Sequence, residues 1–156
     1  MWIGAEIVRE LELVRGHSGC FITVDRFDNL IRSGRVTKGR AWLAGMLDVK
    51  PILGLDADGR VIPVDRVRGR ENVVPKVLSL LDRRLSPRPA SVRFGVVHAN
   101  APEMAERVRT ALVAAYRPKD CIVALATGVL GTHVGEGAWG VFWQVEDGTP
   151  AREGAA

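Results

Sequence analysis

The sequence predicts a two-layer α/β domain built on a mixed six-stranded sheet, with helices mostly covering one face. Strand-like runs alternate with runs of helical period along its 156 residues, a length that fits one domain. The dipeptide Asp58-Gly59 between two strand-like runs predicts an antiparallel hairpin. A helical run over 102–116 separates strands at 91–99 and 121–128, as a right-handed crossover between parallel strands requires. Both kinds of pairing in one sheet speak against a doubly wound, fully parallel fold.

The N-terminal third of the chain predicts three helices and one strand. The run at 20–26, rich in β-branched and aromatic residues, favours a strand. A short helix is expected over 27–34 and a longer one over 38–49, where apolar residues recur at helical spacing. The first helix, over 5–14, has a single apolar stripe and is ended by Gly16; the stripe consists of Ile7, Val8, Leu11 and Val14.

The middle of the chain predicts the hairpin and a second long helix. Pro63 falls inside the second hairpin strand, which indicates a sheet edge or a bulge there, because proline cannot donate to a ladder. The helix over 70–85 tolerates Pro75 because that residue lies near its first turn. One apolar face is expected on this helix, formed by Val74, Val77, Leu78, Leu81 and Leu85.

The remaining strands are expected at 91–99, 121–128 and 137–147. Residues 148–156 show no apolar period, so we expect a disordered tail. The two cysteines, Cys20 and Cys121, each open an apolar strand and are expected to be buried thiols, which suits a reducing compartment.

Composition argues against several classes of protein. The formal net charge is +4 and the isoelectric point is near 9.6, yet the arginines at 60–93 alternate with acidic residues and lack interleaved aromatics. We therefore expect no nucleic-acid binding. No run of 18 apolar residues occurs, and the acidic N-terminal segment does not match a secretory signal. We expect no transmembrane segment and a cytoplasmic location.

The candidate site is the glycine-rich segment around His133. Gly131, Gly135 and Gly137 surround this histidine, and their missing side chains let a ligand or a second backbone segment approach the imidazole. No metal site is expected, because no ligand partner lies at a suitable spacing from His133. His98 ends a predicted strand, but a bond to a neighbouring loop is the simpler explanation for it. One histidine with arginines suits holding an anion better than catalysis.

Three stretches, taken together, resemble the C-terminal lobe of the DegV family of bacterial fatty-acid-binding proteins. They are RSGRVTKGRAWLAGMLDVKPILGLDADGRVIPVDRVRGR, VVHANAPEMAERVR and GVLGTHVGEGAWGVFW. The likeness runs from about residue 20 to 143. It implies a non-enzymatic lipid carrier without cofactor, which presents a long-chain fatty acid to a partner kinase of the dihydroxyacetone-kinase type.

The resemblance also assigns roles to particular residues. In the family, a histidine in a glycine motif binds the fatty acid carboxylate, and His133 matches it, although Glu136 replaces the usual proline. The arginine that supports the carboxylate corresponds to Arg35. An apolar tunnel for the acyl chain is expected near the 38–49 helix and the following strand, with core packing as the alternative role. The tunnel candidates are Leu43, Met46, Leu47 and Ile52.

The same resemblance predicts the domain organisation. Residues 1–147 correspond to the C-terminal DegV lobe, and the N-terminal lobe, which completes the carboxylate cage, is expected to be absent from this chain. A separate N-terminal lobe or self-association is then a possible way to cover the site. Two alternatives stay open: a phosphoryl-transfer enzyme that uses His133, and a lipid-free protein-interaction half-module.

Overall fold

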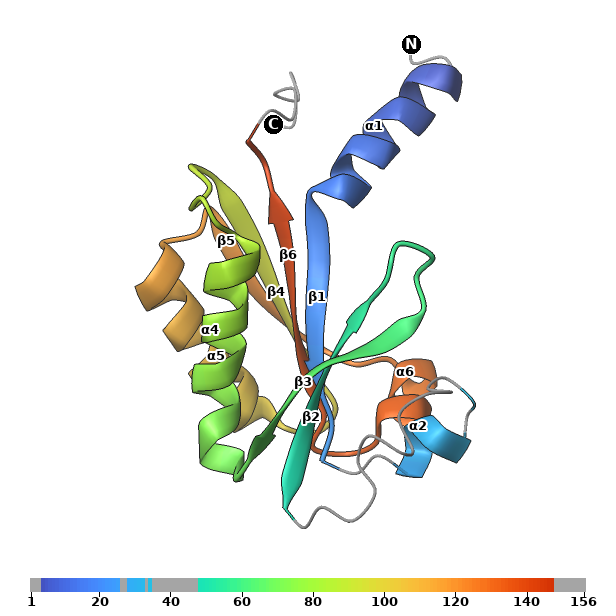
Figure 1. Ribbon diagram of the computed structural model, residues 1–156, viewed down its shortest axis with the longest axis vertical. Coiled ribbons are helices and arrows are strands. Elements are labelled where there is room, and N and C mark those ends of the chain that lie inside the picture. Colours follow the sequence, from blue (N-terminus) through green and yellow to red (C-terminus); the bar gives the residue numbers. More distant parts are fainter. Residues whose placement is uncertain (1–3, 26–27, 33, 35–47, 148–156) are drawn as a thin grey trace.

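The sheet of this protein is mixed and six-stranded, as the sequence predicts (Figure 1). The computed structural model describes residues 4–25, 28–32, 34 and 48–147. The strands lie in the order β3-β2-β1-β6-β4-β5. Their bounds are β1 Ser18–Thr23, β2 Val49–Leu55, β3 Val61–Arg68, β4 Val92–His98, β5 Asp120–Leu125 and β6 Trp139–Val145.

Only the β4–β5 pair is parallel among these strands; every other neighbouring pair is antiparallel. The helix α5 connects β4 to β5, as a parallel pair requires. The described helices are α1 Gly4–Gly16, α2 Asp28–Arg32, α4 Val73–Arg84, α5 Pro102–Tyr116 and α6 Gly128–Val134, with a 3-10 turn, η1 Arg70–Asn72, before α4. The short helix α6 is a difference from the sequence prediction, which expects no helix in this glycine-rich segment.

The β2–β3 hairpin confirms the prediction made from its turn residues. Gly59 has φ 77, and the Asp56 side chain accepts hydrogen bonds from the backbone N–H groups of Asp58 and Arg60. The register of β2 against β3 shifts beside Pro63. Since β3 is also the edge strand, the proline lies where a missing N–H donor costs least.

The hydrophobic core divides between the two faces of the sheet. Helices α4 and α5 cover one face along its length (Figure 1), where Leu81, Val96, Leu112 and Val141 are fully buried. The second cluster packs α2 and α6 against the sheet through Val24, Leu30, Leu53, Val134 and Ala138. This second cluster places α6 over one end of the sheet.

The helix α1 extends from the start of β1 and contributes no buried residue. Most of its apolar stripe is exposed, with Ile7 44%, Val8 55% and Leu11 62% accessible, whereas Val14 is half-buried. None of the helices that the structure describes is long and apolar enough to cross a lipid bilayer.

Candidate functional site: the His133 helix and its glycine turn

His133 lies in the last turn of α6 and is half-buried. Thr127 caps the start of this helix, because its hydroxyl accepts a hydrogen bond from the backbone N–H of Leu130. Gly135 ends it, with its N–H bonded to the carbonyl of Gly131. The imidazole of His133 has no hydrogen-bond or ion-pair partner in the part of the chain that the structure describes. The ring is therefore available to a ligand.

The turn after His133 shows why glycine is needed there. Gly135 and Gly137 have φ values of 78 and 81, which disfavour residues with a side chain. A Cβ at Gly135 would lie 2.6 Å from Nδ2 of Asn29, and a Cβ at Gly137 would collide with the carboxylate of Asp25. Two side chains of the β1–α2 region thus pack directly against the turn. The sequence predicts that these glycines make room either for a ligand or for a second segment of the chain. The contacts of Gly135 and Gly137 favour the second explanation.

Gly131 differs from the two turn glycines. It lies inside α6, and an added Cβ would meet no atom within 4 Å. Its small size leaves open space on this side of the helix.

An apolar cleft lies between α6 and the sheet. Leu130 and Val134, which flank His133 on the helix, both line it. The cleft measures about 20 Å³ and His133 does not line it, so in this structure it has room for little more than one water molecule and can take at most the end of an apolar chain. The other lining residues come from β1, β4, β6 and the segments beside them: Ile22, Val97, His98, Ala99, Ala126, Ala138, Trp139, Gly140 and Phe142.

His98 is a cleft residue that sequence reasoning set aside. Its side chain is nine-tenths buried, and its Nδ1 accepts a hydrogen bond from the backbone N–H of Ala101 at 3.2 Å. The expected bond to a neighbouring loop is therefore present, with an amide in place of a carbonyl. Because Nδ1 is the acceptor, the neutral ring has its proton on Nε2.

A charged cluster adjoins the glycine turn and was also missed. The Asp25 carboxylate pairs with the guanidinium of Arg70, and its Oδ1 lies 3.5 Å from Nζ of Lys50. The only sequence signal was indirect, since Lys50 and Arg70 belong to the KPIL and VRGR stretches that resemble the DegV family. Nothing in the local spacing links them to Asp25.

The other predicted site residues separate into two groups. Arg35, Leu43, Met46 and Leu47 lie outside the described residues, so their roles stay predictions. Ile52 is fully buried in the main core cluster beneath α4 and does not line the cleft under α6.

A larger, more open cleft lies between α1, β1, the β2–β3 turn and the end of α4. It contains no histidine, and none of its lining residues belongs to α6 or the glycine turn. Within the described ranges, no three His, Cys, Asp or Glu side chains gather as a metal site would need. The arrangement around His133 is therefore the best candidate for ligand binding.

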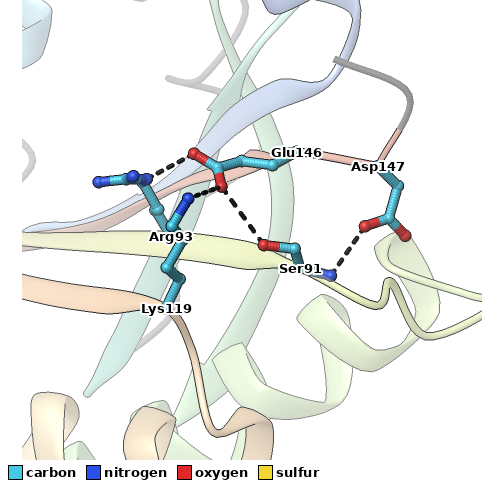
Figure 2. A network of polar contacts seen from close by, with 5 residues as sticks. All are labelled: Ser91, Arg93, Lys119, Glu146 and Asp147. Atoms are coloured by element: carbon cyan, nitrogen blue, oxygen red, sulfur yellow. Dashed lines mark hydrogen bonds and ion pairs between the residues drawn. The ribbon is translucent and has the colours of Figure 1, made fainter. Parts of the chain in front are cut away.

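The opposite end of the sheet contains a different polar arrangement (Figure 2). Glu146 pairs with Arg93 and with Lys119, and it accepts a hydrogen bond from the hydroxyl of Ser91. The hydrogen bonds from Arg93 and Lys119 lower the pKa of Glu146. Asp147 accepts the backbone N–H groups of Ala90 and Ser91, each at 2.7 Å. This cluster ties β4, β5 and β6 together at their shared end.

Comparison with known proteins gives a consistent result. A family model described as "Uncharacterised protein, DegV family" matches residues 4–146. Protein DegV of Bacillus subtilis is 33% identical over 138 residues, covering 88% of this chain and 48% of that protein. A DegV domain-containing protein of Mycobacterium tuberculosis is 39% identical over 134 residues, covering 84% and 46% respectively. The chain thus spans about half the length of the curated relatives it matches.

Solved structures agree with this fold. The crystal structure of DegV from Bacillus subtilis, described as a fatty acid binding protein, has a TM-score of 0.77 at 31% identity and covers 92% of this chain and 50% of that one. A DegV family protein from Thermus thermophilus has a TM-score of 0.83 at 23% identity, with 92% and 51% covered, which supports the fold alone. From the family match, the sequence identities and the shared fold, this chain belongs to the DegV family.

Proposed function

We propose that this chain is the half of a fatty-acid-binding protein that holds the ligand's carboxylate with His133 and Arg35. The proposal is supported chiefly by the imidazole of His133, which has no polar partner among the described residues and is flanked on α6 by Leu130 and Val134 of a small apolar cleft. In this arrangement the carboxylate lies at the end of α6, and the cleft, at about 20 Å³, contacts only a short part of the acyl chain.

The chemistry of the site fits a carboxylate ligand better than a reaction. An imidazole N–H donates to a carboxylate in either protonation state, and charge assistance strengthens the bond when the ring is protonated. Bacillus subtilis DegV is described as a fatty acid binding protein, and a DegV family protein from Eubacterium eligens is described as loaded with heptadecanoic acid. Both descriptions support the same ligand class for this chain.

We propose further that the protein acts without chemistry of its own and presents the carboxylate to a partner kinase. Residues 1–147 then form one lobe of the carrier, with residues 148–156 as a tail and Leu43, Met46 and Leu47 as further acyl contacts. Cys20 and Cys121 are both free thiols, which supports a reducing, cytoplasmic location.

Pairing with a complementary lobe is a second role that the surface favours. Large apolar side chains are exposed on β5 and α6, including Ile122 at 58%, Leu125 at 68% and Val129 at 75%. Clustered exposed apolar side chains are typical of interaction surfaces. This role is compatible with lipid binding, since a second lobe over α6 would shield the carboxylate from water.

Native mass spectrometry tests the ligand. The full natural protein is measured as purified, after organic extraction, and after addition of palmitic acid or its methyl ester. We expect one bound palmitic acid and little binding of the ester, which has no carboxylate. His133→Ala should weaken binding about tenfold or more, whereas His17→Ala, at the other end of β1, is the control. A protein that never retains a fatty acid, or that binds acid and ester equally, would contradict the proposal.

A further inference from the structure

The carboxylate of Asp25 joins three parts of the molecule at the candidate site. Asp25 follows β1 directly, and its Oδ2 pairs with Arg70, which follows β3. Lys50 of β2 lies 3.5 Å from the other carboxylate oxygen and donates to the Asp25 carbonyl at 3.3 Å. The same Oδ2 occupies the space where a side chain at Gly137 would be. One acidic group therefore links two cations to the turn that follows His133.

Fold stability alone does not account for this arrangement. The Arg70 side chain is 61% exposed and that of Asp25 28%, and an ion pair with one exposed partner contributes modestly to stability. The hairpin pair of Asp58 and Arg60 is more exposed, at 65% and 74%, and it lies in the β2–β3 turn, away from α6. What distinguishes the Asp25 pair is its place against the glycine turn.

The turn determines where the His133 imidazole lies. On one side, Gly137 donates to the carbonyl of Ala99, and Ala99 donates to the carbonyl of Ala138, both at 2.8 Å. On the other side, the turn packs against Asp25 and Asn29. Because His133 has no polar partner of its own in the described residues, its orientation depends on the helix and on this turn.

We propose that Asp25 is a positioning residue for the carboxylate site. Held by Lys50 and Arg70, it fixes the glycine turn and, through the turn, the end of α6 that presents His133. This inference rests on the proposed role of His133 as a ligand of the fatty acid carboxylate.

The two cations also have an electrostatic role. A lone Asp25 carboxylate beside the site would repel the carboxylate of a fatty acid, since like charges within about 8 Å interact at physiological salt. Lys50 and Arg70 place two positive charges against this one negative charge, so the cluster as a whole attracts an anion. Loss of Arg70 should weaken ligand binding through both position and charge.

The first experiment measures position without any ligand. NMR spectra report the amide signals of Gly135 and Gly137 and the ring signals of His133 in the wild type and in variants. We expect Asp25→Ala and Arg70→Ala to shift all three sets of signals, and Asp25→Asn, which keeps the shape, to shift them less. Arg60→Ala removes the matched exposed pair of the hairpin and should leave them unchanged.

Two outcomes of this experiment bear against the inference. Unchanged Gly137 and His133 signals in Asp25→Ala would overturn it, as would equal shifts in Arg60→Ala. If Asp25→Ala fails to fold, Arg70→Ala decides the question, because an arginine that is 61% exposed can be truncated without creating a cavity in the core.

The second experiment measures binding of palmitic acid to the full natural protein. Asp25→Ala and Arg70→Ala should each raise the Kd about tenfold, Arg70→Lys should restore part of the affinity, and Arg60→Ala should have no effect. A wild type that binds no palmitic acid contradicts the proposed function, while the NMR result still decides the positioning role. A wild type that binds, with variants that bind equally well, overturns the inference.

Discussion

The two ends of β4 and β6 differ in how their polar groups are satisfied. At the end that starts β4, Glu146 and Asp147 have partners on two neighbouring segments, residues 90–93 and Lys119: two cations, one hydroxyl and two backbone amides. At the end where β4 stops, the chain passes into the glycine turn and α6. There the His133 ring has no partner in the described chain, and an apolar cleft opens beside it.

We call the end with Glu146 and Asp147 the self-contained end of this pair of strands, and the end with His133 the open end. The charges and amides of the Glu146 cluster are paired with one another, so this cluster serves stability, although the buried Nδ1 of His17 at the same end makes no hydrogen bond in the described residues. The imidazole of His133 has no polar partner among the described residues and lies near an apolar cleft. It can therefore gain a hydrogen bond from a bound ligand. We therefore expect substitutions at one end to change folding and substitutions at the other end to change binding.

The largest expected effect is a loss of stability at Gly137. This residue is an exception to the division between binding and folding, because it lies at the open end but is needed for folding. Gly137→Ala places a Cβ on the Asp25 carboxylate and strains a backbone with φ 81. We expect a loss of about 2–4 kcal/mol in the free energy of unfolding, measured by urea denaturation. Gly131→Ala is the matched control.

That control should change stability in the opposite direction. Gly131 is helical, and its Cβ would meet open space, so alanine should stabilise the protein by about 0.5–1 kcal/mol. An equal loss in the free energy of unfolding for Gly137→Ala and Gly131→Ala would contradict the prediction, because it would show that the turn is no more constrained than the helix α6.

A smaller effect is expected at the self-contained end. Asp147→Ala removes the acceptor of two short amide hydrogen bonds, from Ala90 and Ser91, and should cost about 1–2 kcal/mol in the free energy of unfolding. The affinity for palmitic acid should be unchanged, because α6 and its cleft lie at the other end of the strands. Weaker lipid binding with unaltered stability would contradict the division between the two ends.

The sequence predicts the stable parts of this fold better than the open end. The spacing of apolar residues predicts the helix with Val77, Leu81 and Leu85 on one face, because one side of an amphipathic helix returns every 3.6 residues. All three side chains are buried in the structure. The hairpin followed from Asp58-Gly59 for an equally local reason. The mixed sheet could be inferred because turn chemistry and crossover length are both local signals.

Sequence reasoning failed where the structure depends on contacts between distant segments. The sequence does not predict helix α6, because the glycines within and after it disfavour a helix. In the structure the Thr127 cap and the packing of Val134 stabilise it. The Asp25 cluster brings residues 25, 50 and 70 together through strand pairing, and no spacing rule predicts this. His133 was predicted from the glycines around it and from the resemblance to the DegV family, and its role as a carboxylate ligand stays a prediction.

A third prediction separates the two ends most directly. His133→Ala should change the free energy of unfolding by no more than about 0.5 kcal/mol, because the half-buried ring has no polar partner among the described residues to leave unpaired. Affinity for palmitic acid, measured by calorimetry, should fall about tenfold, equivalent to about 1.4 kcal/mol. Asp147→Ala provides the reciprocal control. If His133→Ala unfolds the protein, His133 contributes to stability, and the contrast between the two ends of the strands is lost.

The smallest expected effect is the pH dependence of the Glu146 cluster. Hydrogen bonds from Arg93 and then Lys119 lower the pKa of Glu146 in the folded protein. A carboxylate whose folded pKa lies below the unfolded value of about 4.3 stabilises the protein fully above that value, and the contribution is lost as pH falls through the folded pKa. Glu146→Gln should therefore lower the free energy of unfolding at pH 7 and have a diminishing effect below about pH 4.

The matched control for this pH dependence is Glu106→Gln. The pKa of Glu106 is also lowered, through its hydrogen bond from Arg109, but this pair lies within one exposed turn of α5 and connects no separate strands. Urea denaturation at pH 7, 5 and 3 should show a larger pH-dependent difference for the Glu146 variant than for the Glu106 variant. If the two variants behave alike, the Glu146 cluster acts as an ordinary surface ion pair, and the stability of that end comes instead from Asp147 and the two amides that it accepts.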